Sequence, residues 1–240
     1  MMVNAAIEDA LDRITQRAQD VQRAFTPGGA PNFGDVATDR ATSRAAFDPL
    51  SVAPPPDAYF LTTDERGRSA YTRDGGFALR DGTLVGANGR TILGFTSSGG
   101  ATGELHVDAV DDALGRINDL RIEPNGALVY DRMAIDPRSG AREREHVVVG
   151  QLALARFPAA TKLASSDANH VVAPPGTVPH VGRAGDGNFA SLAPMQREES
   201  RIDFDRSLDR LQEAYVAFDA LQAAHKAQGG IVKTAMDLLK

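Results

Sequence analysis

The two ends of the chain carry the clearest pattern of apolar and polar positions. Within each terminal region, apolar side chains recur at spacings that alternate between four and three residues. A repeat of about 3.5 residues keeps one apolar stripe facing a partner helix. The pattern therefore predicts two terminal helices that form a coiled-coil-like module. The N-terminal series is Ile7, Leu11, Ile14, Ala18, Val21 and Phe25, and the C-terminal series is Phe204, Leu208, Leu211, Tyr215, Phe218, Val232, Met236 and Leu239.

Between these helices the pattern changes to short apolar runs separated by turn residues. Residues 58–63 and 69–72 read as two strands joined by a turn, and a valine- and leucine-rich run over 147–157 reads as a longer strand. Asp81-Gly82 and Asn88-Gly89 are the dipeptides that favour tight hairpin turns. We therefore expect a mainly β fold, in which an antiparallel β domain of short strands and hairpins is flanked by the terminal helices.

Proline and glycine clusters suggest where these regions meet. Residues 27–56 contain Pro27-Gly28-Gly29 and the run Pro54-Pro55-Pro56, which favours an extended backbone. Small polar residues near Ser200 can cap a helix that starts there. The predicted domains are an N-terminal assembly helix over 1–26, an extended connector over 27–56, a β-rich outer domain over 57–195 and a C-terminal assembly helix over 196–240.

Composition narrows the class of partner. A net charge of -6 argues against a general nucleic-acid binder, which needs a basic surface to displace counterions from phosphates. No run of about 18 apolar residues is present, so we expect no membrane span. The N-terminal region mixes charged residues into its apolar positions and lacks the apolar stretch of a cleaved signal peptide.

The sequence offers little that resembles a catalytic or metal site. It contains no cysteine, and its five histidines do not have the spacing of a helical zinc motif. A nucleophile elbow is absent, and Gly185-Asp186-Gly187 lacks the strand and helix that a phosphate loop requires. Asp108, Asp111 and Asp112 lack the ligand spacing of a calcium loop and read as a solvated loop. We therefore expect no enzyme activity, no cofactor and no metal.

Four segments follow one another in the order of a known family. Residues 70–77 read Ala-Tyr-Thr-Arg-Asp-Gly-Gly-Phe, 149–158 form a strand ending in Arg-Phe-Pro, and 200–203 read Ser-Arg-Ile-Asp. Residues 222–239 read Gln-Ala-Ala-His-Lys-Ala-Gln-Gly-Gly-Ile-Val-Lys-Thr-Ala-Met-Asp-Leu-Leu. This ordered set resembles the bacterial flagellar rod and hook proteins, whose hairpin reads Tyr-Thr-Arg-x-Gly-x-Phe. The first helix lacks the family's asparagine-rich stretch, so the resemblance covers about 57–240.

The resemblance implies a structural subunit of the flagellar axis. Such a subunit passes unfolded through the flagellar type III export apparatus without signal cleavage and polymerises in the basal body or hook, outside the cytoplasm. Its partners are further copies of itself and other axial proteins, and its work is to transmit torque. The resemblance assigns assembly to both terminal helices, with Ile7, Leu11, Ile14 and Val21 facing the C-terminal apolar series.

Two other interpretations stay open at the level of sequence. The chain could be a secreted β-rich module that binds a glycan or a cell-surface partner, with Phe60, Tyr71 and Tyr130 as its aromatic platform and the helices as an oligomerising stalk. A hydrolase that uses carboxylates such as Asp74 and Asp111 has less support. Each apolar stripe could also simply pack on its own domain.

Overall fold

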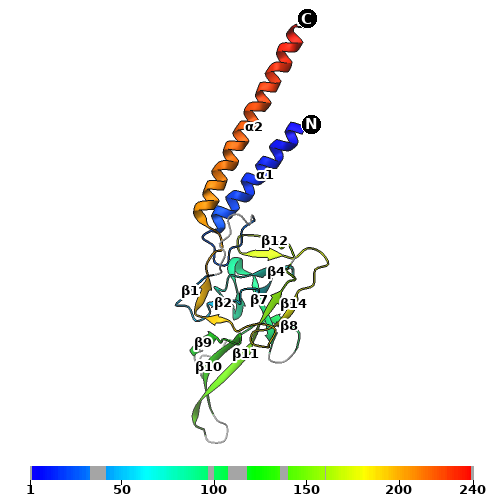
Figure 1. The fold of residues 1–240 in the computed structure, drawn as a ribbon. Helices are drawn as coiled ribbons and strands as arrows, with labels where there is room; N and C mark the ends of the chain where they lie inside the picture. Colours follow the sequence, from blue (N-terminus) through cyan, green and yellow to red (C-terminus); the bar gives the residue numbers. More distant parts are fainter. Residues whose placement is uncertain are drawn as a thin grey trace. The chain divides into compact units, whose positions relative to one another are not determined.

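The computed structural model describes residues 2–32, 42–96, 100–107, 118–135, 140–159 and 161–238, and the side chains of 2–4, 118 and 231–238 are not part of that description. The chain divides into two compact units. Unit 1 comprises residues 1–25, 30–40 and 201–240, and unit 2 comprises 26–29 and 41–200. Figure 1 shows the elements of both.

Unit 2 is built on a 12-stranded sheet whose strand pairs are antiparallel. Two further pairs, β1 with β16 and β2 with β15, lie outside that sheet. The strands are β1 (Ser43–Ala45), β2 (Val52–Ala53), β3 (Tyr59–Thr63), β4 (Ser69–Thr72), β5 (Ala78–Arg80), β6 (Thr83–Val85), β7 (Thr91–Thr96), β8 (Thr102–Glu104), β9 (Asn118–Ile122), β10 (Ala127–Ile135), β11 (Arg142–Arg156), β12 (Ala164–Ser165), β13 (His170–Val172), β14 (His180–Arg183), β15 (Ala193–Pro194) and β16 (Gln196–Glu198).

The 15-residue strand β11 is the centre of this sheet, because it pairs with β3, β7, β10 and β14. Leu152 and Leu154 of β11 are fully buried and pack in the core with Phe60, Phe77 and Leu128. Gly150 allows this packing, because a Cβ atom there would lie 2.6 Å from both the Leu105 side chain and the Phe95 carbonyl oxygen. The hydrophobic effect of this core is the main force that holds unit 2 together.

Tight turns join the short strands as their sequences predict. Asp81 and Gly82 have φ angles of 50° and 78°, and Asn88 and Gly89 have 58° and 68°. Two successive positive φ values are those of a type I′ turn, which matches the twist of a hairpin. Asn88 and Gly89 belong to a short 3₁₀ turn, η2 (Ala87–Gly89).

A buried ion pair fixes the end of β16 to the segment that follows β4. The guanidinium of Arg73 donates through Nε to both carboxylate oxygens of Glu198, at 3.0 and 2.8 Å, and also to the carbonyl oxygens of Pro55 and Ala58. Gly28 packs on the Arg73 backbone with a φ of 66°, and its amide donates to the Glu198 carbonyl oxygen. Residues far apart in sequence therefore share one polar junction inside unit 2.

Unit 1 contains α1 (Met2–Arg23) and α2 (Phe204–Leu238), which pack against each other. Asp203 caps α2, since its carboxylate accepts the Arg206 amide at 3.1 Å, as the small polar residues near Ser200 predict. After α1 the chain folds back, and the Asn32 amide donates to the Asp20 carboxylate at 2.7 Å. The Asn32 side chain also donates to the carbonyl oxygen of Gln16 at 3.2 Å, so this segment is held on α1.

The stretch predicted as an extended connector contributes structure to unit 2. It contains β1 and β2, which pair with β16 and β15 from the other end of that unit. Leu50, Ser51, Val52 and Ala53 within it are buried. Its middle part, 33–41, lies outside the described residues.

The predicted fold class is wrong in its coiled-coil-like module. Strands make up 39% of the structure, and the large antiparallel sheet has one helix before it and one after it in the chain. The described residues also show no long coiled-coil-like helix pair. Leu11 and Tyr215, which that arrangement would bury in a common stripe, are 45% and 50% exposed. Coiled-coil packing requires such side chains to insert between four residues of the partner helix, and these two point to solvent instead.

Candidate assembly site on the terminal helices

The packed face of α1 differs from the predicted stripe at one position. Ala10 and Ile14 are buried, and Ile7 and Val21 are half-buried, whereas Leu11 is exposed. Three of the four predicted α1 positions thus lie on or near the packed face, and Ala10 takes the place of Leu11. The predicted apolar series omits Ala10, whose small side chain contributes little apolar area.

The packed face of α2 likewise includes some of the predicted positions and not others. Ser207 is buried, Leu211, Ala214, Phe218 and Leu221 are half-buried, and these positions repeat at alternating spacings of four and three. Of the predicted α2 positions, Leu208, Leu211 and Phe218 are half-buried, and Phe204 and Tyr215 are exposed. Val232 and Met236 lie on α2 with side chains outside the description, and Leu239 lies outside the described residues.

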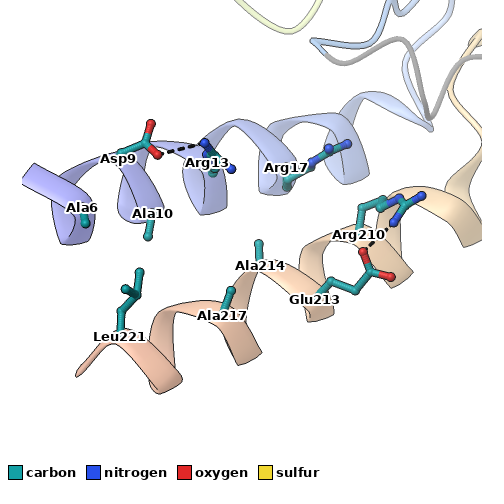
Figure 2. A pocket seen from close by; sticks show the side chains of 10 residues that line it. All are labelled: Ala6, Asp9, Ala10, Arg13, Arg17, Arg210, Glu213, Ala214, Ala217 and Leu221. Atoms are coloured by element: carbon teal, nitrogen blue, oxygen red, sulfur yellow. Dashed lines mark hydrogen bonds and ion pairs between the residues drawn. The ribbon is translucent and has the colours of Figure 1, made fainter. Parts of the chain in front are cut away.

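Small side chains between the helices leave a groove rather than a filled interface. Figure 2 shows Ala6 and Ala10 of α1 opposite Ala214, Ala217 and Leu221 of α2. The groove has a volume of about 480 Å³, and it is open to solvent on one side. A methyl group is too short to cross the space that a leucine pair would fill, so the packing stays incomplete. The alanine spacing is the sequence signal that could have revealed this groove.

Charged side chains also line this groove. Arg13 pairs with Asp9 on α1 at 3.0 Å, and Arg210 pairs with Glu213 on α2 at 2.6 Å. These are pairs within one helix, at spacings of four and three residues, and they are well exposed. Such pairs contribute little to stability, and they leave the helix backbone free to approach another helix.

Large apolar side chains also remain in water on other faces of the terminal helices. Leu11, Tyr215 and Val216 are exposed, and the Phe25 and Phe204 rings contact each other with their centroids 4.9 Å apart while both stay accessible. Single exposed apolar residues are ordinary, but several on two adjacent helices indicate an interaction surface. The terminal helices therefore present an alanine-lined groove and, on other faces, exposed apolar side chains, and the chemistry of both is that of helix packing.

The carboxylates considered for hydrolysis give no support to that interpretation. Asp74 is buried, and its oxygens accept from Arg197 at 2.7 Å, from the Asn169 side chain at 2.9 Å and from the Gly76 amide at 3.0 Å. These hydrogen bonds use the Asp74 carboxylate to hold together the loop that contains it. Asp111 lies outside the described residues.

A buried histidine near Asp74 also has a structural environment. His170 Nδ1 lies 2.8 Å from the Asp167 carboxylate, and the ring is fully buried. Burial lowers the pKa of His170 and outweighs the opposing effect of Asp167. Burial acts to raise the pKa of Asp167, but hydrogen bonds from His170 and the Asn169 amide lower it further than burial raises it. The pair is thus a neutral imidazole bonded to a carboxylate.

The three rings considered as a glycan platform are not arranged on one open surface. Phe60 and Tyr130 are buried in the core of unit 2. Tyr71 is half-buried and meets Phe157 edge to face, with ring centroids 4.8 Å apart, and its burial raises the pKa of its hydroxyl. A stacking platform needs exposed ring faces, which Phe60 and Tyr130 do not present.

The described residues form no metal site or membrane-spanning helix, and the chain matches no known family model. Within the described parts of the chain, no group of three or more histidine, aspartate or glutamate side chains is placed to hold a metal ion. In the same parts, no helix has the length and apolar character needed to cross a membrane. A scan against protein-family models finds no match, and a search of curated proteins finds no significant match.

Proposed function

We propose that this chain is a structural axial subunit of the bacterial flagellum, of the rod or hook type, which polymerises through its terminal helices. The observation that carries the proposal is that α1 and α2 leave large apolar side chains exposed and an alanine-lined groove open between them. The resemblance of four ordered segments to the rod and hook family supplies the biological setting. In that setting the subunit passes through the flagellar export apparatus and acts outside the cytoplasm.

The groove fits a helix from a neighbouring copy. Alanine side chains let helix backbones approach closely, and a third helix laid along Ala10 and Ala214 would cover the incomplete packing. Leu11 and Tyr215 do not line the groove, so their removal from water would need a second contact with a neighbouring copy on another face of the helices. Contacts of this kind join unlike surfaces, and they extend into a filament when the rotation between copies does not close a ring.

Two substitutions at exposed apolar positions of α1 and α2 test the proposal. Leu11→Glu with Tyr215→Glu should block assembly of the full-length protein, because it places charges in the contact. Gln16→Glu with Gln212→Glu is the matched control, since it adds the same charge at exposed polar positions of the same helices. Sedimentation velocity and electron microscopy measure assembly. Equal assembly of both variants would refute the role of Leu11 and Tyr215 in assembly.

The groove itself is tested by adding volume. Ala214→Leu should hinder assembly by filling the space, whereas Ala220→Leu places the same side chain at an exposed position of α2 and should not. The biological half of the proposal predicts that deletion of the gene abolishes motility and stalls the basal body at a defined stage. Normal motility in the deletion strain would overturn the flagellar assignment.

A further inference from the structure

The strands β10 and β11 continue past the body of the sheet as a two-stranded ribbon. The last β9 pairing is Asn118 with Asp131, and beyond it β10 pairs with β11 alone among the described residues, as far as Ile135 with Arg142. Figure 1 shows this end of β10 and β11 extending away from the other strands of unit 2. Both faces of the ribbon are therefore open to contact.

The register sorts the ribbon side chains into two faces, because antiparallel partners share a face and neighbours in a strand alternate. One face, which we term the basic face, carries Val148, Met133, Ile135, Arg142 and Arg144, together with Asp131 and His146. The opposite face, which we term the acidic face, carries Glu143, Glu145, Arg132 and Ala134. Tyr130 and Val147 at its base point toward the core.

The apolar residues of the ribbon lie on the side that should be polar. A half-buried antiparallel sheet places apolar side chains toward the core and polar ones toward water. Here Met133, Ile135 and Val148 are 38%, 48% and 47% exposed on the face opposite Tyr130 and Val147, although Val129 at the base of the same face is buried. The continuation of the core side is charged instead. This inversion is costly for an isolated chain and indicates that the basic face is covered by another molecule.

The charges of the two faces are complementary. On the basic face, Asp131 accepts from His146 at 2.9 Å and lies 3.9 Å from Arg144, so the arginines leave this face positive. On the acidic face, Arg132 pairs with Glu145 at 2.7 Å, and Glu143 leaves an excess of negative charge. Stacking two basic faces would bring arginines together, whereas a basic face on an acidic face places opposite charges in contact.

We infer that the ribbon is a second contact between copies of this chain, in which the basic face of one copy packs on the acidic face of the next. Met133 and Ile135 then lie over Ala134 and the aliphatic stem of Arg132 in the neighbouring copy. The contact joins two different surfaces, so it can repeat along the open array of the proposed function on which this inference rests.

Charge reversal on one face at a time tests the inference in the full-length protein. Arg142→Glu with Arg144→Glu makes both faces acidic, and Glu143→Lys with Glu145→Lys makes both faces basic. Each variant alone should raise the concentration for half-maximal assembly by about tenfold, which corresponds to about 1.4 kcal/mol. An equimolar mixture should restore assembly to within about threefold of wild type, because acidic and basic ribbons then alternate. Recovery in the mixture is the result that a merely destabilised fold would not give.

Controls separate this inference from the proposed function. Arg44→Glu with Arg66→Glu makes the same charge change at exposed positions away from the ribbon and should assemble as wild type. In the Leu11→Glu/Tyr215→Glu background, mixing the two ribbon variants should still produce heterodimers by sedimentation. Wild-type assembly by either ribbon variant alone, or failure of the mixture to recover, would overturn the ribbon contact and leave the helix contact standing. Unchanged assembly of the helix variant would overturn the helix contact alone.

Discussion

Removal of the Arg73 guanidinium is the sharpest perturbation of the fold. Arg73 and Glu198 are each 3% exposed, and the guanidinium also holds the carbonyl oxygens of Pro55 and Ala58. Truncating one partner of a buried ion pair costs about 3–5 kcal/mol, because the other charge stays in a medium that solvates it poorly. We therefore expect Arg73→Met to lower the free energy of unfolding of unit 2 by about 4 kcal/mol.

Urea unfolding followed by near-ultraviolet circular dichroism measures this loss. Tyr59, Tyr71 and Tyr130 all lie in unit 2, and Arg73 lies over the Tyr59 ring at 5.4 Å, so the aromatic signal reports on this junction. With a urea dependence of about 2 kcal/mol per molar, the midpoint should fall by about 2 M. Arg68→Met is the control, since it removes an arginine from an exposed pair with Asp64 and should leave the midpoint unchanged.

A second substitution shows whether the buried charge is the cause. Arg73→Met with Glu198→Leu removes both charges and should recover at least about 2 kcal/mol relative to Arg73→Met alone. The reasoning is refuted if Arg73→Met costs less than about 1 kcal/mol. It is equally refuted if the two single losses simply add, because additivity would mean that the charges do not interact.

Two further predictions concern α2 and pH. Gly229→Ala with Gly230→Ala should stabilise α2 by about 1 kcal/mol for each glycine, since no described atom lies within 4 Å of either Cβ position, and amide exchange along α2 should slow. The lowered pKa of His170 keeps its imidazole neutral in the native state. Stability should therefore be complete above pH 6.5 and fall as pH drops from 6.5 toward the lowered native pKa, and His170→Asn should abolish that slope in urea titrations. The lowered pKa of Asp167 acts only below pH 3.8.

Local features of the fold follow from the sequence because short-range forces determine them. The Asp81-Gly82 and Asn88-Gly89 turns require positive φ angles, and few other dipeptides adopt them at low cost. The cap at Asp203 also needs only its own helix. By contrast, the alternating charges of residues 142–145 suit an exposed strand edge or a loop, and pairing with β10 makes them the start of β11.

Long-range junctions could not be predicted from one sequence. Arg73 and Glu198 are 125 positions apart, and neither stands in a pattern that marks it as buried. The burial of Leu50 to Ala53 likewise depends on pairing with β15, which lies far along the chain. Charged and proline-rich segments are exposed on average, and they become buried only where a specific partner supplies the hydrogen bonds or charges that they need.

The helices illustrate how a heptad pattern can be present and still serve another purpose. Within unit 1, Ala10, Ser207 and Ala214 occupy the packed positions, and the larger Leu11 and Tyr215 stay in water. Other members of the apolar series, such as Ile14, Leu211 and Phe218, are buried or half-buried. The monomer thus buries part of the series and leaves Leu11 and Tyr215 available for another contact. Substitutions at Leu11 and Tyr215 should therefore change assembly at constant monomer stability, whereas Ile14→Ala should lower stability first.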